Sequence, residues 1–144
     1  MYRVHNERRD PTRRTAIDSD NTIDHWEQER ERLNALVLDH ANLNVRRFFA
    51  LDHQAYVDGV LPARTKELLG LVASLVLRCD DCITYHVLRC VEEGVTRDEM
   101  VEAMNVGLVV GGSIVIPHLR RAMERLTEAE KRSAVRDSAQ IPST

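Results

Sequence analysis

The chain has 144 residues, 43% of them apolar and 30% charged, proportions that suit one soluble domain with a single core. A formal net charge of -3 and an aromatic content of 4% give no reason to expect a nucleic-acid partner. The start of the chain lacks the apolar segment of a signal peptide, and the longest apolar stretch, 106–117, is too short to cross a bilayer. We therefore expect a cytoplasmic protein with no membrane partner.

The first half of the chain predicts a polar arm followed by two helices. Residues 1–22 are polar, mix charges of both signs and lack apolar periodicity, so we expect an N-terminal arm. Apolar residues then recur at helical spacing, which predicts a helix that begins at Asp24, with this aspartate as its cap. A second helix is expected from about Asn44 to Asp58, ended by Gly59.

The middle of the chain predicts two core helices joined by a short turn. Pro62 favours the first turn of a helix that is apolar on nearly all sides, so this helix should be central and end near Cys79. The next helix should run from there to Gly94, a residue type that commonly ends helices. Thr96 and Glu99 have the spacing of a capping box and predict the start of a further helix.

The last third of the chain predicts two more helices and a polar end. Gly107 and Gly111 lie four residues apart and favour the close approach of another helix. Ser113 follows a break at two glycines and can cap a last core helix, whereas the residues from Thr127 onward are polar. We expect an all-α fold of about six helices. Its expected divisions are the arm at 1–22, a helical domain at 23–127 and a polar C-terminal tail at 128–144.

Two cysteines and a histidine are the most informative residues of the chain. Cys79 and Cys82 form a CxxC pair, and His86 follows Cys82 by four residues, so the ring and the second thiol share one face of a helix. Asp80 or Asp81 can cap this helix, which would place Cys82 in its first turn. A helix N-terminus and a nearby base both favour a thiolate, whereas the two aspartates oppose it.

The same spacing supports a complete dithiol cycle. A thiolate at Cys82 can attack an oxidant to form a sulfenic acid, and Cys79 can then condense with it to form a disulfide. An external dithiol must reduce the pair again. Three cysteines without an export signal fit a reducing compartment, where a CxxC pair more often serves catalysis or metal binding.

Glu67 is an acidic residue in an otherwise nearly apolar helix. A buried carboxylate at this position would need a partner, and His86 is the natural one. Twelve helical residues, about 18 Å of axis, separate Glu67 from Cys79, so contact with His86 requires a crossing angle, an irregular turn or a bridging water. An exposed glutamate near a helix N-terminus is an equally good reading of the spacing.

Together these residues resemble a known active site. Glu67, Cys79, Cys82 and His86, in the frame E-x11-C-x2-C-x3-H, are similar to the active site of the alkyl hydroperoxidase D (AhpD) family, within the carboxymuconolactone decarboxylase-like superfamily. The resemblance covers about residues 45–126 and includes the glycine-rich stretch 106–113. It implies an all-α fold and a homo-oligomer, either a trimer or a hexamer.

The resemblance also implies a role for each residue of the frame. Cys82 would be the peroxidatic cysteine and Cys79 the resolving one, while His86 and Glu67 would form a proton relay. The implied activity is a thiol-dependent (alkyl hydro)peroxidase or disulfide oxidoreductase. Its partners would be a hydroperoxide and a dithiol, thioredoxin-type or lipoyl-type reductant, with no metal or organic cofactor.

One position departs from the family pattern. The best-known AhpD sequences have a second histidine just before the peroxidatic cysteine, and here that position holds Asp81. The departure bears on the strength of thiol activation and on the identity of the electron donor. Decarboxylation is not expected, because the branch that names the superfamily lacks the cysteine pair.

Two other functions fit parts of the pattern. Cys79, Cys82, His86 and Cys90 have the spacing of a short zinc module, although ligands along one helix stripe cannot surround a metal tetrahedrally. A non-catalytic oligomer that uses the dithiol as a redox sensor is the second alternative. For Cys90 itself, a small core residue is the favoured interpretation.

Overall fold

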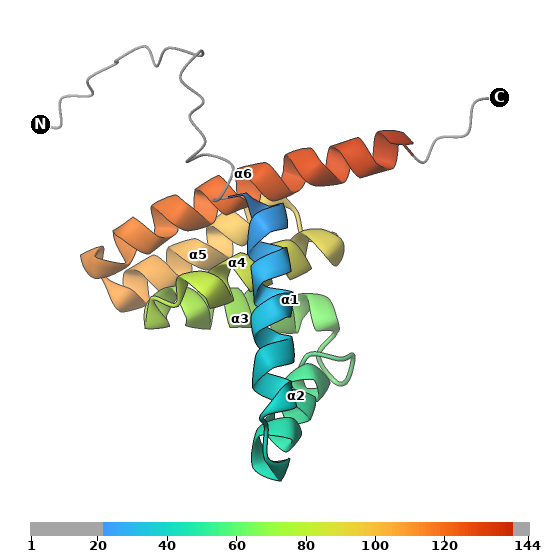
Figure 1. Cartoon of the computed structure of the whole chain (residues 1–144). Helices are drawn as coiled ribbons and strands as arrows, with labels where there is room; N and C mark the ends of the chain where they lie inside the picture. Colours follow the sequence, from blue (N-terminus) through green and yellow to red (C-terminus); the bar gives the residue numbers. More distant parts are fainter. Residues whose placement is uncertain (1–21, 140–144) are drawn as a thin grey trace, which may run out of the picture. The chain divides into compact units, whose positions relative to one another are not determined.

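The computed structural model describes residues 22–139, and within them the fold is all-α, as predicted (Figure 1). The elements in chain order are α1 (Ile23–Asp39), α2 (Leu43–Ala55), α3 (Ala63–Leu77), α4 (Asp80–Glu92), α5 (Arg97–Gly111), the short 3-10 helix η2 (Ser113–Val115) and α6 (Ile116–Ala139). The polar arm predicted for residues 1–22 lies outside the described residues except for Thr22.

The chain divides into two compact units, residues 1–40 and 41–144, and α1 is the helix described in the first. Its cap is Thr22, whose hydroxyl accepts the His25 N–H at 3.2 Å, rather than the predicted Asp24. Asp24 instead lies in the first turn, where its charge suits the helix dipole.

In the second unit, α2 begins close to its predicted start and ends before its predicted end. Asn42 caps it by accepting the Val45 N–H at 3.1 Å. The helix ends at Ala55 rather than at Asp58, and the Asp58 carboxylate instead accepts the Ala63 N–H at 2.7 Å, at the start of α3. Pro62 is the residue that precedes α3, close to the predicted first turn.

The core lies among α3, α4, α5 and α6. Helix α3 packs against both α4 and α5, and α4 packs against α6. Close approach at Gly107 was predicted, and a Cβ there would lie 3.1 Å from Leu75 Cδ2 on α3. The fully buried side chains of this core include Leu71, Leu75, Val87, Met100, Met104 and Leu126.

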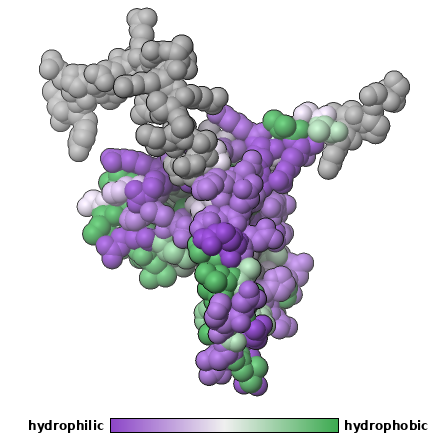
Figure 2. All heavy atoms as spheres, in the orientation of Figure 1, coloured by the Kyte–Doolittle hydropathy of each residue, from purple (hydrophilic) through white to green (hydrophobic). Residues whose placement is uncertain are grey.

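Helix α3 is less enclosed than its apolar sequence predicts. Small residues, Gly70 and Ser74, are buried on its inner face, whereas Leu69 and Leu77 are 56% and 75% exposed. Apolar side chains also reach the surface elsewhere, and Figure 2 shows them among predominantly polar ones.

The junction between α4 and α5 follows its local sequence signals closely. Gly94 adopts a φ of 70°, which lets the Val95 N–H return to the Cys90 carbonyl at 2.9 Å. The predicted capping box is present. The Thr96 hydroxyl accepts the Glu99 N–H, and the Glu99 carboxylate accepts the Thr96 N–H.

The C-terminal part differs from prediction at two points. Ser113 is the first residue of η2 rather than the cap of the last core helix, and Gly112 holds the cap position before it. The polar segment after Thr127 is not a separate tail, since α6 continues to Ala139. Two observations explain the extension: Ala129 is buried on the same face as the preceding core residues, and Glu130 accepts a hydrogen bond from Arg97 Nε at 3.0 Å.

No helix within residues 22–139 combines the length and the apolar character that a membrane span requires.

Replacing Thr96 with alanine should destabilise the fold, because the first turn of α5 would lose its capping oxygen. We expect the free energy of unfolding to fall by about 1 kcal/mol, measured by urea denaturation at fixed protein concentration. Thr96→Ser retains the hydroxyl and serves as the matched control. Equal stability of Thr96→Ala and the wild type would contradict a role for the box.

Candidate active site

The two cysteines of the CxxC pair are joined at the start of α4. Arg78, in the left-handed region at φ 61°, ends α3, and Cys79 is the N-cap of α4. Cys79 and Cys82 form a disulfide with their Cα atoms 5.3 Å apart, and the Cys79 sulfur also accepts the Cys82 N–H at 3.3 Å. Cys82 thus lies in the first turn, as predicted, but the cap is Cys79 rather than an aspartate.

Asp80 is paired with two basic side chains of α6. His118 Nδ1 lies 2.8 Å from one of its oxygens and Arg121 Nε lies 2.9 Å from the other. Burial acts to raise the pKa of Asp80, but the hydrogen bonds from Arg121 and His118 outweigh it and lower the pKa below its usual value. The negative charge of Asp80 was expected to oppose a thiolate at Cys82. Basic groups from another helix offset this charge.

The contact between Glu67 and His86 decides between the two readings of the glutamate. Glu67 Oε2 accepts a hydrogen bond from His86 Nδ1 at 2.8 Å, and the two residues are only 1% and 7% exposed. The buried reading is therefore correct, and the contact is direct. Helices α3 and α4, joined by only two residues, pack closely enough for these side chains to meet.

Gly70 makes room for the imidazole ring. A Cβ at this position would lie 2.4 Å from His86 Cε1, 2.7 Å from Nε2 and 2.8 Å from Nδ1, so close that the ring or the helix would have to shift. The ring of His86 therefore rests directly on the backbone of α3. A glycine in a helix interior is a weak sequence signal, and our sequence analysis did not identify it.

Arg89 is a second partner of the buried carboxylate that sequence reasoning missed. Its Nε lies 3.6 Å from Glu67 Oε1, on the side opposite His86, and the same guanidinium also pairs with Glu92 and Glu93. Arg89 follows His86 by three residues on α4, so it shares the face of the helix that meets α3. Burying a carboxylate that has a basic partner at each oxygen costs far less free energy than burying an unpaired one.

Two tyrosine rings enclose His86. Tyr56 lies just after α2, with its hydroxyl 3.5 Å from His86 Nε2 and its ring centroid 5.1 Å from that of the imidazole. Tyr85 makes an edge contact with the imidazole at a centroid distance of 5.2 Å. Tyr56 was missed, because no local pattern connects residues 30 positions apart in the chain.

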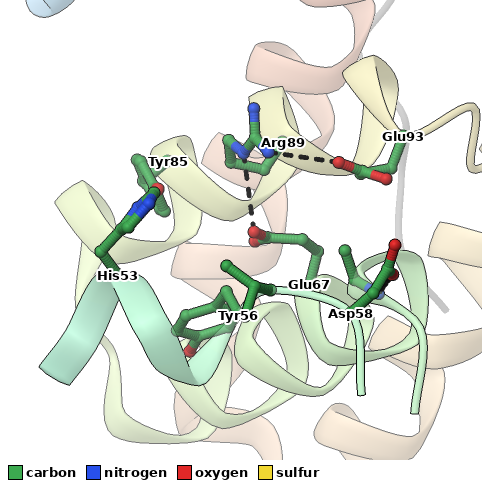
Figure 3. A pocket seen from close by; sticks show the side chains of 9 residues that line it. His53, Tyr56, Asp58, Glu67, Tyr85, Arg89 and Glu93 are labelled. Carbon is green, nitrogen blue, oxygen red and sulfur yellow. Dashed lines mark hydrogen bonds and ion pairs between the residues drawn. The ribbon is translucent and has the colours of Figure 1, made fainter. Parts of the chain in front are cut away.

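A cavity of about 560 Å³ adjoins the buried carboxylate (Figure 3). Figure 3 shows Glu67 between Arg89 and Tyr56 in its wall. His53 also lines this cavity. Cys82 is not among the lining residues and is itself exposed. Cys82 is therefore open to solvent, whereas the cavity lies on the Glu67 side of the site.

The third cysteine is separate from this chemistry. Cys90 is fully buried, as predicted for a core residue, and burial raises the pKa of its thiol to about 12. It therefore stays protonated and unreactive at neutral pH. Among residues 22–139, no three His, Cys, Asp or Glu side chains are grouped so that they could hold a metal ion.

Comparison with known proteins identifies one family. The sequence model of the carboxymuconolactone decarboxylase family matches residues 44–125, which include all four residues of the frame. Among curated proteins, an uncharacterized protein of the cox locus of Paracoccus denitrificans is 31% identical over 83 residues, which are 58% of this chain and 75% of that protein. An uncharacterized protein of Cupriavidus necator is 33% identical over 55 residues, 38% of this chain and about half (49%) of its own length.

Solved structures show the same fold. A Thermotoga maritima protein, TM1620, superposes with a TM-score of 0.74 at 54% identity, covering 76% of this chain and 96% of that one. A second crystal structure of TM1620 gives a TM-score of 0.71 at 50% identity over 83% of this chain and 98% of that one. That protein belongs to the carboxymuconolactone decarboxylase family and has been suggested to take part in an antioxidative response. A family protein from Legionella pneumophila has a TM-score of 0.64 at 27% identity, covering 75% of this chain and 94% of that one.

Gly70→Ala should destabilise the protein, although alanine normally stabilises a helix relative to glycine. The new methyl group would overlap the His86 ring, and we expect a loss of about 1–3 kcal/mol in the free energy of unfolding, measured by urea denaturation. Gly59→Ala is the matched control, since a Cβ there meets only Lys66 Nζ at 3.5 Å. If Gly70→Ala is as stable as Gly59→Ala, the ring does not rest on α3.

Proposed function

The chain belongs to the carboxymuconolactone decarboxylase family, and we propose that it is a thiol-dependent hydroperoxidase of the AhpD type. In this proposal Cys82 attacks the peroxide, Cys79 resolves the intermediate, and His86 with Glu67 relays the proton. The observation that carries the proposal is the buried hydrogen bond between His86 and Glu67, one helical turn after an exposed Cys82. A carboxylate that orients an imidazole beside a thiol is a general arrangement for activating a nucleophile.

The residues can account for each step of the reaction. His86 accepts the proton of the Cys82 thiol, and the thiolate attacks one oxygen of the hydroperoxide, so that an S–O bond forms and the O–O bond breaks. The departing alkoxide takes the proton from His86 and leaves as an alcohol. Cys79 then attacks the sulfenic acid, releases water and forms the disulfide. An external dithiol restores the two thiols and is itself oxidised.

The relationship to TM1620 supports an antioxidant role, because a protein of the same fold has been suggested to act in an antioxidative response. The fold alone would not be sufficient, since one fold can carry several chemistries. The four residues of the frame and their burial pattern add evidence that is specific to this chain. A dithiol, thioredoxin-type or lipoyl-type reductant remains our proposal for the electron donor.

We also propose that the protein assembles as a homo-oligomer, a trimer or a hexamer. The surface of α2 supports this, because the helix has no buried residue and exposes Leu43, Phe48 and Leu51. Large apolar side chains exposed along one helix are typical of a surface that another protein chain covers.

A hydroperoxide added to the reduced protein should produce the Cys79–Cys82 disulfide and should be consumed repeatedly when a dithiol is supplied. Mass spectrometry and a peroxidase assay with several dithiol donors measure these two outcomes. Cys82→Ser should abolish turnover, and Cys79→Ser should stop at a sulfenic acid that a dimedone probe traps. Cys90→Ala is the control and should retain turnover, since Cys90 is buried and protonated.

The same assay separates an enzyme from a redox sensor. A sensor would be oxidised once, without consuming further peroxide in the presence of the donor. Thiols that remain reduced in excess peroxide would refute the peroxidase proposal.

His86→Ala should slow the alkylation of reduced Cys82 by iodoacetamide at pH 7 by about 10-fold or more, because the thiol would lose its base. Glu67→Gln should slow it by a smaller factor, since the ring would lose its negatively charged partner. Glu92→Gln removes a more exposed carboxylate paired with the same Arg89 and is the matched control. An unchanged rate in His86→Ala would remove the histidine from the mechanism.

A further inference from the structure

The structure gives a partner to each ring nitrogen of His86. Nδ1 faces the Glu67 carboxylate at 2.8 Å, and Nε2 faces the Tyr56 hydroxyl at 3.5 Å. A carboxylate can only accept a hydrogen bond, so Nδ1 carries the hydrogen. A neutral imidazole has a single N–H group, which leaves a lone pair on Nε2 for the Tyr56 O–H to approach.

The Tyr56 hydroxyl is suited to the role of a donor. Burial, followed by the negative charge of Glu67, raises the pKa of Tyr56 above its usual value, so the phenol keeps its proton at neutral pH. Its ring packs on the imidazole at a centroid distance of 5.1 Å, which holds the hydroxyl near Nε2 independently of the hydrogen bond.

The Nε2 lone pair is also the group that must accept the proton of Cys82 in the proposed reaction, since Nδ1 is committed to Glu67. In the structure Cys82 is bonded to Cys79, and a disulfide sulfur has no proton to donate. Tyr56 is then the donor that faces Nε2. At 3.5 Å the contact is at the long end of hydrogen-bond distances, so a donor that approaches Nε2 more closely can displace it.

We infer that Tyr56 is a positioning residue that replaces Cys82 at Nε2 of His86 once the disulfide has formed. Its hydroxyl then holds the ring in the tautomer that the next cycle requires, with the hydrogen on Nδ1. This inference rests on the proposed dithiol chemistry, but not on the identity of the oxidant. Because the bond between Tyr56 and His86 belongs to the oxidised state, it also favours the disulfide over the dithiol.

The Tyr56→Phe variant tests the inference, since it removes the hydroxyl and keeps the ring. In the oxidised wild-type protein, nitrogen-15 NMR of the His86 ring should show Nδ1 protonated and Nε2 unprotonated. The titration midpoint of this ring should move to higher pH in Tyr56→Phe by about 0.4–1 unit, because a donor to the lone pair stabilises the neutral ring. The other groups near the ring, Glu67 on α3 and Arg89 and Tyr85 on α4, are unchanged.

The redox state supplies the decisive comparison. In the reduced protein the Cys82 thiol should occupy Nε2, so Tyr56→Phe should move the midpoint less than it does in the oxidised protein. In a dithiothreitol redox buffer, the disulfide-to-dithiol equilibrium of Tyr56→Phe should shift about 2- to 10-fold toward the dithiol. Tyr85→Phe, whose ring also contacts His86, is the matched control and should leave both measurements unchanged.

Several outcomes would overturn the inference: a protonated Nε2 in the oxidised wild type, an unmoved midpoint in Tyr56→Phe, an equal shift in both redox states, or an unchanged redox equilibrium. None of these measurements uses peroxide. A failed peroxidase assay would therefore refute the proposed function and leave the role of Tyr56 to be decided separately by the ring titration and the redox equilibrium.

Discussion

The buried hydrogen bond between Glu67 and His86 is the constraint on which the site depends. Removing a carboxylate from water is costly unless partners replace the lost hydration, and here an imidazole and a guanidinium, from His86 and Arg89, occupy opposite oxygens. Both partners lie on α4, three residues apart, so one helix face supplies both. The fold must therefore hold α3 and α4 close together, which the two-residue connection and the absence of a side chain at Gly70 achieve.

Features set by neighbouring residues were predictable from the sequence, whereas those set by packing were not. The capping box of Thr96 and the helix end at Gly94 depend on a few consecutive residues, and both were predicted correctly. Ser113 and Asp80 were given capping roles by the same logic, but capping depends on competing partners. Asp80 binds α6, and Ser113 opens a 3-10 helix.

The site shows the same division. The frame of four residues was recognisable from spacing, but spacing left the burial of Glu67 undecided, because the answer depends on how α3 and α4 approach each other. Tyr56 and Arg89 had no local signal that could reveal them. Each becomes significant only through its distance to His86 or Glu67. The place of Cys82 in the first turn of α4, by contrast, followed from the expected helix start and needed no tertiary information.

The charge around the thiol pair is set partly by a helix that contributes no residue to the frame. The N-terminus of α4 favours an anion at Cys82, and the adjacent Asp80 would weaken this effect if its charge were unpaired. His118 and Arg121 of α6 bind both oxygens of that carboxylate, so much of its field is cancelled near the sulfur. The position that holds a histidine in the best-known AhpD sequences is Asp81 here, so the chain lacks one basic group next to Cys82. Basic side chains of α6 thus offset a negative charge at the start of α4 from across the helix interface, whereas nothing in the local sequence replaces the basic group that is missing before Cys82.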